Sequence, residues 1–158
     1  MFCVGDKIVH PMHGAGIVDN IVEKKINGVS RHYYILKLPA NGMLVMIPTS
    51  NSEEIGVRPV MDSARAAQIL DAIDTIEVET NANWNQRYRE NMLRLKSGDL
   101  MEVARVVKSL MLRDNQRGLS TGERKMLHSA KQILISEIVL SNCASYEEVE
   151  ARINTVLG

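Results

Sequence analysis

An Asn-Gly pair between two β-branched runs limits the folds that are open to the first sixty residues. Asn27-Gly28 lies between residues 21–26 and 29–36, which are rich in Ile, Val and Tyr. Asn-Gly supplies the positive φ angles of a two-residue hairpin turn. A second pair, Asn41-Gly42, precedes the apolar run 43–47. The sequence therefore predicts consecutive antiparallel hairpins.

Two further strands are expected in the same region. Residues 7–10 form one, and the Gly14-Ala15-Gly16 sequence allows a sharp bend into the next strand. Residues 57–60 contain Pro59, which restricts them to the edge of a sheet. Four or five short strands within sixty residues predict a small, strongly curved barrel of the SH3 or Tudor kind.

Helical signals begin at residue 62. Five residues with capping side chains precede the predicted helices: Asp62, Asn83, Asp99, Ser120 and Ser145. Ser120 with Glu123 forms a capping box, in which each partner satisfies a free N–H group. Gly118 ends the third helix, and residues 77–81 are expected to form a loop. The fold class is thus α+β, with a barrel over residues 1–60 and a compact bundle of about five helices over residues 61–158.

The net charge hides a strong regional asymmetry. The chain has 19 basic and 19 acidic residues, which by itself argues against nucleic-acid binding. By region, the net charge is +1 for residues 1–60 and −4 for residues 61–83. It is +6 for residues 84–131, from eleven basic and five acidic side chains, and −3 for residues 132–158. The positive segment is a candidate nucleic-acid interface, because a binder needs a local basic face and not a basic total.

The remaining composition argues against a secreted, membrane or enzymatic protein. Two cysteines in 158 residues indicate free thiols, and no signal peptide or spanning segment is visible, so a cytoplasmic location is expected. A metal-dependent enzyme using Cys3, His10 and His13 stays open as an alternative, although Pro11 interrupts regular spacing. No phosphate loop or nucleophile motif appears. We therefore expect no enzyme, no metal and no cofactor.

Trp84, the only tryptophan, allows two interpretations. The stripe formed with Tyr88, Met92 and Leu95 has helical spacing, which favours a side chain that faces the core. The polar and basic neighbours of Trp84 instead suit an aromatic platform or wedge that stacks on bases.

Basic residues recur at helical spacing around this position. Arg87 shares a face with Arg94, and Arg89 shares one with Lys96. Arg124, with Lys125 beside it, begins a stripe that continues through His128 and Lys131. These residues form either a solvated face or a set of phosphate contacts. Three or four phosphate contacts would give a logarithmic salt slope of roughly −3 to −4.

Several segments carry a family resemblance. Two N-terminal segments are Val4-Gly5-Asp6 and the run from His10-Pro11 to His13-Gly14-Ala15-Gly16. C-terminal ones are residues 83–89 (Asn-Trp-Asn-Gln-Arg-Tyr-Arg), 96–99 and 113–127. Across nearly its whole length the chain resembles the CarD/CdnL family of bacterial transcription regulators. The N-terminal motif is shared with transcription-repair coupling factors, whose helicase motors do not fit within 158 residues.

The resemblance implies a division of labour between the two domains. The Tudor-like barrel would bind the RNA polymerase β subunit, with Lys24 and Met46 at contact positions, although the family has arginine where Met46 stands. The helical domain would lie on promoter DNA at the upstream edge of the bubble. Trp84 would insert into the minor groove as a wedge, and Arg89, Arg124 and Lys125 would hold the backbone.

Together these observations predict a monomeric, non-enzymatic regulator that stabilises the open promoter complex. Its DNA-binding residues would be Trp84, Arg87, Arg89, Arg124 and Lys125, and polymerase would bring it to the nucleoid. The alternative is an adaptor that binds polymerase without a direct DNA role, in which Trp84 belongs to the core.

Overall fold

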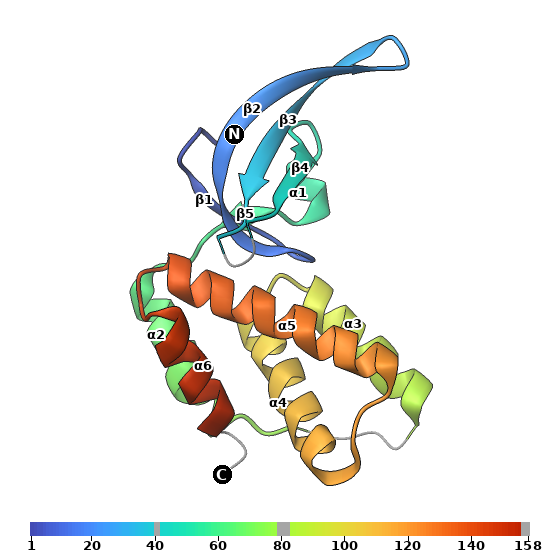
Figure 1. Cartoon of the computed structure of the whole chain (residues 1–158), viewed down its shortest axis with the longest axis vertical. Coiled ribbons are helices and arrows are strands. Elements are labelled where there is room, and N and C mark those ends of the chain that lie inside the picture. Colours follow the sequence, from blue (N-terminus) through green and yellow to red (C-terminus); the bar gives the residue numbers. More distant parts are fainter. Residues whose placement is uncertain (40–41, 79–82, 156–158) are drawn as a thin grey trace.

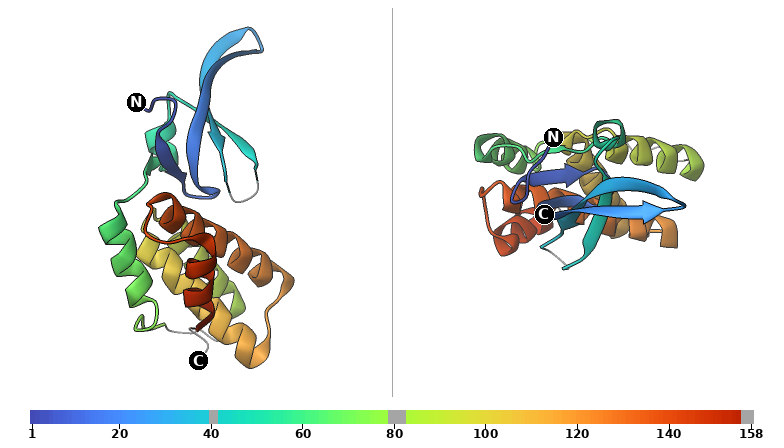
Figure 2. Two further views of the ribbon diagram at one scale, coloured as in Figure 1. Left: turned by 60° about the vertical axis from the view of Figure 1, so that its left-hand side comes forward. Right: turned by 90° about the horizontal axis from the view of Figure 1, so that it is seen from above.

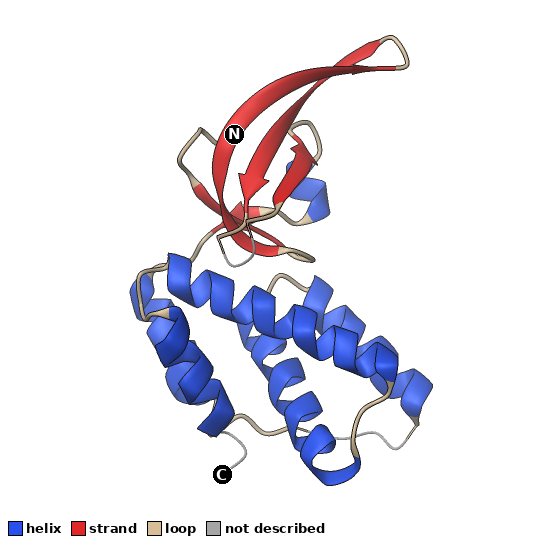
Figure 3. Cartoon of the chain, viewed as in Figure 1, coloured by secondary structure: helices blue, strands red, loops and turns tan. Residues whose placement is uncertain are grey.

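The protein consists of a β-sheet part followed by a helical part (Figure 1). The structure is a computed structural model, and it describes residues 1–39, 42–78 and 83–155. Strands and helices are segregated along the chain, and one single-turn helix lies within the sheet part (Figure 3). This arrangement confirms the predicted α+β fold class.

In the part of the chain that the structure describes, five antiparallel strands form one sheet in the order β4-β3-β2-β1-β5. They are β1 (Lys7–His10), β2 (Gly14–Ile26), β3 (Val29–Lys37), β4 (Leu44–Pro48) and β5 (Arg58–Pro59). β4 and β5 are the two edge strands. The strand that contains Pro59 lies at an edge, as predicted, because proline cannot donate to a further ladder.

The β2–β3 hairpin is the longest feature of the sheet. Its turn has Asn27 at φ 52° and Gly28 at φ 79°, the left-handed pair that the sequence predicted. Pairing continues from Ile26–Val29 back to Ile17–Lys37, with a register shift at Val18/Asn20. The tip of this hairpin projects away from the rest of the molecule (Figure 1). In the second Asn-Gly pair, Asn41 lies outside the described residues.

The sheet encloses its own small core. Ile8, Val18, Tyr34, Leu36 and Ile47 are almost fully buried there. Between β4 and β5 the chain forms α1 (Ser52–Ile55), a single helical turn that was not predicted. Four residues are too short to show helical periodicity, so the sequence pattern carries no signal for this turn.

Among the described residues, five helices form the second part: α2 (Ser63–Ala72), α3 (Trp84–Lys96), α4 (Leu100–Arg117), α5 (Thr121–Leu140) and α6 (Tyr146–Asn154). All five predicted N-caps accept a hydrogen bond from the backbone of the first turn. Residues 77–78 are non-helical, as predicted, and residues 79–81 of the expected loop lie outside the described part of the chain.

The helices bury a core separate from that of the sheet. Val106 and Leu110 of α4 pack with Leu134 and Ile138 of α5, all almost fully buried. α5 lies across the side of the bundle that faces the sheet, next to β2 (Figure 2). None of the described helices has the length and apolarity that crossing a membrane requires.

Candidate nucleic-acid and partner interfaces

Trp84 is the first residue of α3 and is 41% exposed. The Asn83 side chain caps the helix by accepting from the Gln86 backbone N–H at 3.1 Å. The indole stacks on Tyr88, with ring centroids 5.1 Å apart and an angle of 20° between the rings. Further along the predicted stripe, Tyr88 and Met92 pack against the helical core, and Leu95 is buried in it. Trp84 therefore lies where this stripe emerges at the surface.

The indole is held in place by the first turn of α5. Its Nε1–H donates to the Glu123 carboxylate and to the Ser120 hydroxyl, both at 3.1 Å. The same two residues form the Ser120 half of the predicted capping box: the Ser120 Oγ accepts from the Glu123 backbone N–H at 3.2 Å, while the Ser120 hydroxyl donates to the Glu123 carboxylate at 3.3 Å. Ser120 and Glu123, which lie 36 and 39 positions after Trp84 in the sequence, thus fix the orientation of the indole ring.

The structure corrects the prediction for Arg87. Its Nε donates to Glu123 Oε2 at 3.0 Å, and its Nη2 donates to Oε1 at 3.3 Å. The two side chains are only 4% and 3% exposed. A guanidinium enclosed in this way is not available to a phosphate group. Arg87 therefore binds the carboxylate that holds the Trp84 indole and does not belong to the exposed basic surface.

Arg87 also controls the ionisation of Glu123. Burial alone would raise the pKa of the Glu123 carboxyl. The hydrogen bonds and positive charge of Arg87, assisted by Ser120 and Arg113, outweigh burial and lower the pKa below its ordinary value of 4.5. The carboxylate is therefore ionised at neutral pH, and its bonds to Trp84 and Arg87 are charge-assisted.

Three of the predicted basic residues do lie at the surface. Arg89, Arg124 and Lys125 are exposed. Arg89 and Lys96 line a shallow hollow of about 460 Å³ along α3, together with Trp84 and Tyr88. Arg124 and Lys125 directly follow Glu123, the residue that holds the indole. Exposed cations beside a half-exposed aromatic ring can contact both the backbone and the bases of a nucleic acid.

Lys24 and Met46 share one face of the sheet. Lys24 pairs with Arg31 across the β2–β3 ladder, and Met46 pairs with Ile35 across the β3–β4 ladder. Arg31 and Ile35 are four residues apart on β3 and so point to the same side. Lys24 is exposed and Met46 is 40% exposed. The opposite face of the same strands carries the buried Tyr34 and Leu36.

The two N-terminal histidines form a packed pair. The His10 and His13 rings lie 4.6 Å apart, and His10 Nδ1 accepts from the Met12 backbone N–H at 3.0 Å. Burial and then the neighbouring His13 lower the pKa of His10 to about 4. Among the described residues, no three His, Cys, Asp or Glu side chains are grouped to hold a metal ion.

Sequence reasoning missed the second role of Glu123, which it assigned only to a capping box. It also missed Glu137, which is fully buried and bonded to Arg58 of β5. The signal for Glu137 was a charged residue inside the apolar run 133–140, because such a residue in a core requires a partner. No comparable local signal identifies the partner of Glu123.

Comparisons with known proteins cover both parts of the chain. The family model described as "CarD-like/TRCF RID domain" matches residues 2–61. The model described as "CarD, C-terminal domain" matches residues 68–154. A Bacillus subtilis (strain 168) protein named "Putative transcription factor YdeB" is 39% identical over 138 residues, which cover 87% of this chain and 90% of that protein.

Proposed function

Because this chain belongs to the CarD family, we propose that it is a transcription factor that joins RNA polymerase to promoter DNA. The sheet part binds the polymerase β subunit, and the helical part binds DNA at the upstream edge of the bubble. There Trp84 acts as a wedge that stabilises the open complex. The observation that carries this proposal is the half-exposed Trp84 beside Arg89, Arg124 and Lys125.

The physics of a wedge favours melted DNA over duplex. Inserting a side chain into intact duplex costs a few kcal/mol of lost stacking. At the edge of a bubble the stack is already broken, so an aromatic ring recovers about 1–3 kcal/mol there. A ligand shifts an equilibrium only by its differential affinity for the two states. A preference of about 1–2 kcal/mol shifts the balance between open and closed complexes by roughly 5- to 30-fold.

The internal bonds of Trp84 support contact without sequence readout. The indole Nε1–H is its only hydrogen-bond donor, and it is committed to Glu123 and Ser120. The ring can then offer only its apolar surface to a base pair. Polymerase would bring the protein to the correct place on the promoter, and the exposed cations would contact the phosphates.

The polymerase contact would use the sheet face that carries Lys24 and Met46. This face belongs to β2, β3 and the edge strand β4, whose free backbone groups suit pairing with a strand of a partner. Two exposed cations, Lys24 and Arg31, lie opposite each other on it. Their mutual repulsion would be relieved by an acidic partner surface.

A polymerase adaptor without a DNA role is the second candidate. The observation in its favour is that Trp84 is tied to Glu123 and stacked on Tyr88, which would also suit a purely structural side chain. In that case the indole would stabilise the α3–α5 contact and would not touch a base.

The lifetime of the open complex distinguishes the two candidates. With wild-type protein the lifetime should increase, and Trp84→Ala should abolish most of the increase while binding to polymerase persists. The matched control is Tyr146→Ala, because Tyr146 is an aromatic residue of similar exposure (39%) on α6. Circular dichroism would verify that each variant folds. A folded Trp84→Ala protein that extends the lifetime as the wild type does would exclude the wedge.

A further inference from the structure

Arg58 of β5 and Glu137 of α5 connect the two parts of the protein. The Arg58 guanidinium donates to both Glu137 carboxylate oxygens, each at 2.6 Å. Glu137 is fully buried, and Arg58 is 29% exposed. The paired fork geometry makes this contact directional as well as strong.

The same two side chains reach two further segments. Glu137 accepts from the Met61 backbone N–H at 3.0 Å, which secures the linker that leads into α2. The Arg58 Nε donates to the Gly98 carbonyl at 3.0 Å, at the corner between α3 and α4. We call Arg58, Glu137, Met61 and Gly98 the interdomain clamp.

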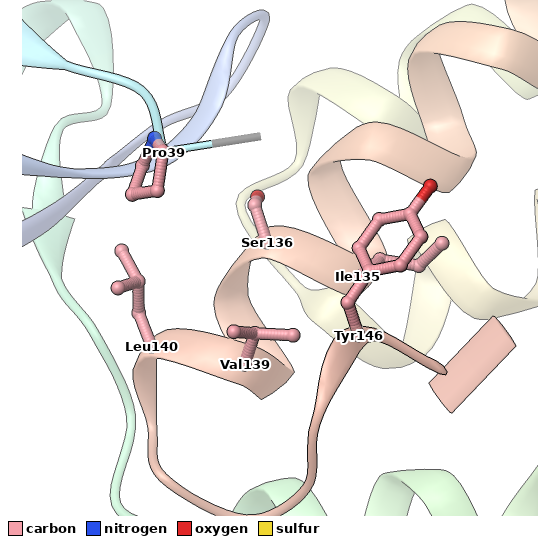
Figure 4. Close-up of a pocket in the computed structure, with 6 residues that line it drawn as sticks. All are labelled: Pro39, Ile135, Ser136, Val139, Leu140 and Tyr146. Carbon is pink, nitrogen blue, oxygen red and sulfur yellow. The ribbon is translucent and has the colours of Figure 1, made fainter. Parts of the chain in front are cut away.

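Polar contacts and close backbone packing join the two parts. The hydrophobic core of the sheet and that of the helices have no residue in common in the part of the chain that the structure describes. Beside the Ala15–Ser136 hydrogen bond, a hollow of about 310 Å³ separates Pro39 of the sheet part from Leu140 and Tyr146 (Figure 4). Domains within one chain move relative to each other unless their interface is large and hydrophobic. The clamp, together with the Ala15–Ser136 and Lys7–Leu140 hydrogen bonds, can therefore set the angle between the two parts, and it is the only one of these polar contacts among the described residues that pairs two charged side chains.

α5 connects the clamp to the Trp84 site. Glu137 binds Arg58 near one end of this helix, and Glu123 binds Trp84 and Arg87 near the other. The two glutamates are fourteen positions apart in the sequence, which corresponds to about 21 Å along a helix. The corner held by Arg58 also follows α3, the helix that begins with Trp84. The two helices that hold Trp84, α3 and α5, are thus both connected to the sheet through Arg58.

We propose that Arg58 and Glu137 are positioning residues that hold Trp84 at a fixed distance and direction from the polymerase-binding face. This inference rests on the proposed function. Two weak contacts on one rigid body act together, because the first contact raises the effective concentration of the second. If the angle between the parts varied freely, each contact would keep its own affinity, but their joint effect would fall.

The test measures the distance between the two parts of the protein separately from their effect on the open-complex lifetime. Spin labels would be placed on the full-length chain at two exposed positions, Glu53→Cys in the sheet part and Gln116→Cys at the end of α4, with Cys3 and Cys143 replaced by serine. Pulsed electron paramagnetic resonance then measures the distance between the parts. Glu137→Gln removes the charge of the clamp at constant shape, and Arg58→Lys keeps the charge but removes the fork. Glu102→Gln, which removes a partly exposed carboxylate that pairs with Arg94 and Arg105 within the bundle, is the matched control.

We expect one narrow distance distribution for the wild type and Glu102→Gln, and a broad one for both clamp variants. The increase in open-complex lifetime should fall at least about fivefold in the clamp variants, while binding to the isolated β subunit stays within about twofold. A narrow distribution in folded Glu137→Gln and Arg58→Lys, or a broad one with unchanged lifetime, would overturn the inference.

Failure of the proposed function gives a different result. In that case the wild type itself leaves the open-complex lifetime unchanged, whatever the distances are. If Glu137→Gln does not fold, Arg58→Lys supplies the same comparison, because lysine preserves the charge balance around the buried carboxylate. If neither variant folds, the clamp is needed for folding itself and not only for the angle between the two parts. That result also contradicts a positioning role.

Discussion

At the scale of single residues, Glu123 determines the geometry of the candidate DNA site. The sequence assigns it to a capping box, and it does occupy that position. Its side chain also binds the buried Arg87 and orients Trp84. One carboxylate thus links the start of α5 to the start of α3. Its removal should affect both stability and the exposed aromatic ring.

Replacing Glu123 with glutamine should lower the free energy of unfolding by about 3–5 kcal/mol. Glutamine preserves the shape and can still accept from the indole, but it removes the negative charge that Glu123 places against the buried Arg87 guanidinium. Urea denaturation followed by circular dichroism measures the loss. Glu90→Gln is the control, because Glu90 accepts only a longer bond of 3.3 Å from Gln86 nearer the surface. Equal losses in both variants would contradict the role of the buried pair.

The Arg87–Glu123 pair should stabilise the protein less at low pH than at neutral pH. The pKa of Glu123 is lower in the folded protein than its ordinary value of 4.5. Its contribution is therefore fully present above about pH 4.5 and is lost as the pH falls through the folded pKa. The difference in unfolding free energy between wild type and Glu123→Gln should shrink below pH 4.5. A difference that stays constant from pH 7 to pH 3 would show that ionisation of Glu123 has no part in it.

At the scale of secondary-structure elements, the turn that begins β2 lies directly against α5. Gly14 has φ +91°, and a Cβ atom there would lie 2.6 Å from Ser136 Oγ and 3.2 Å from the backbone Cα of Ile133. The next residue, Ala15, donates its N–H to Ser136 Oγ at 2.9 Å. Only glycine permits this approach of a strand to a helix.

Gly14→Ala should destabilise the protein by about 1–3 kcal/mol more than Gly28→Ala does. Both positions have a positive φ angle, so backbone strain is common to the two variants. A Cβ atom at Gly28 would meet nothing within 4 Å, whereas one at Gly14 would push against α5. Thermal or urea unfolding measures the difference. Equal destabilisation would mean that α5 can move away from β2 without cost.

At the scale of the whole molecule, zero net charge coexists with one cationic region. The excess of +6 over residues 84–131 is kept at the surface, because the buried Arg87–Glu123 pair removes one basic and one acidic residue and leaves ten against four. Acidic segments flank this region along the chain. We therefore expect weak binding to free DNA and dependence on polymerase for recruitment.

The salt dependence of DNA binding tests this charge distribution. With Arg89, Arg124 and Lys125 as the phosphate contacts, the slope of log K against log salt should be about −3. Arg124→Ala should reduce the slope by about one, whereas Arg117→Ala, at an exposed position near the end of α4, should leave it unchanged. Fluorescence anisotropy measures binding to a labelled duplex and to a second duplex of the same base composition with a scrambled sequence. A steeper slope or a clear preference for one sequence would contradict the proposed contacts.

Local features of the fold were predictable from the sequence. The Asn27-Gly28 turn, the edge position of Pro59 and all five helix caps are confirmed. Each depends on the backbone preference of a residue or on bonds to neighbours within three or four positions. The single-turn helix α1 was missed because it is too short to produce a periodic pattern. The domain boundary at residues 60–61 and the DNA and polymerase contacts stay predictions.

The site itself was only partly predictable. The sequence identified Trp84 and the surrounding cations, but it placed Arg87 on the exposed face. Helical spacing tells which residues share a face and not whether another helix covers that face. Burial of Arg87 depends on α5, whose Glu123 lies 36 positions further along the chain.

The sequence by itself thus determined the kinds of element, their order and the regional charge, because these follow from composition and short-range chemistry. Only the tertiary structure decided which charges are free and which are paired. Glu123 meets Arg87, and Glu137 meets Arg58 from 79 positions away, because α5 packs against both α3 and the sheet. A buried charge is stable only beside a partner, and packing brings the partner there.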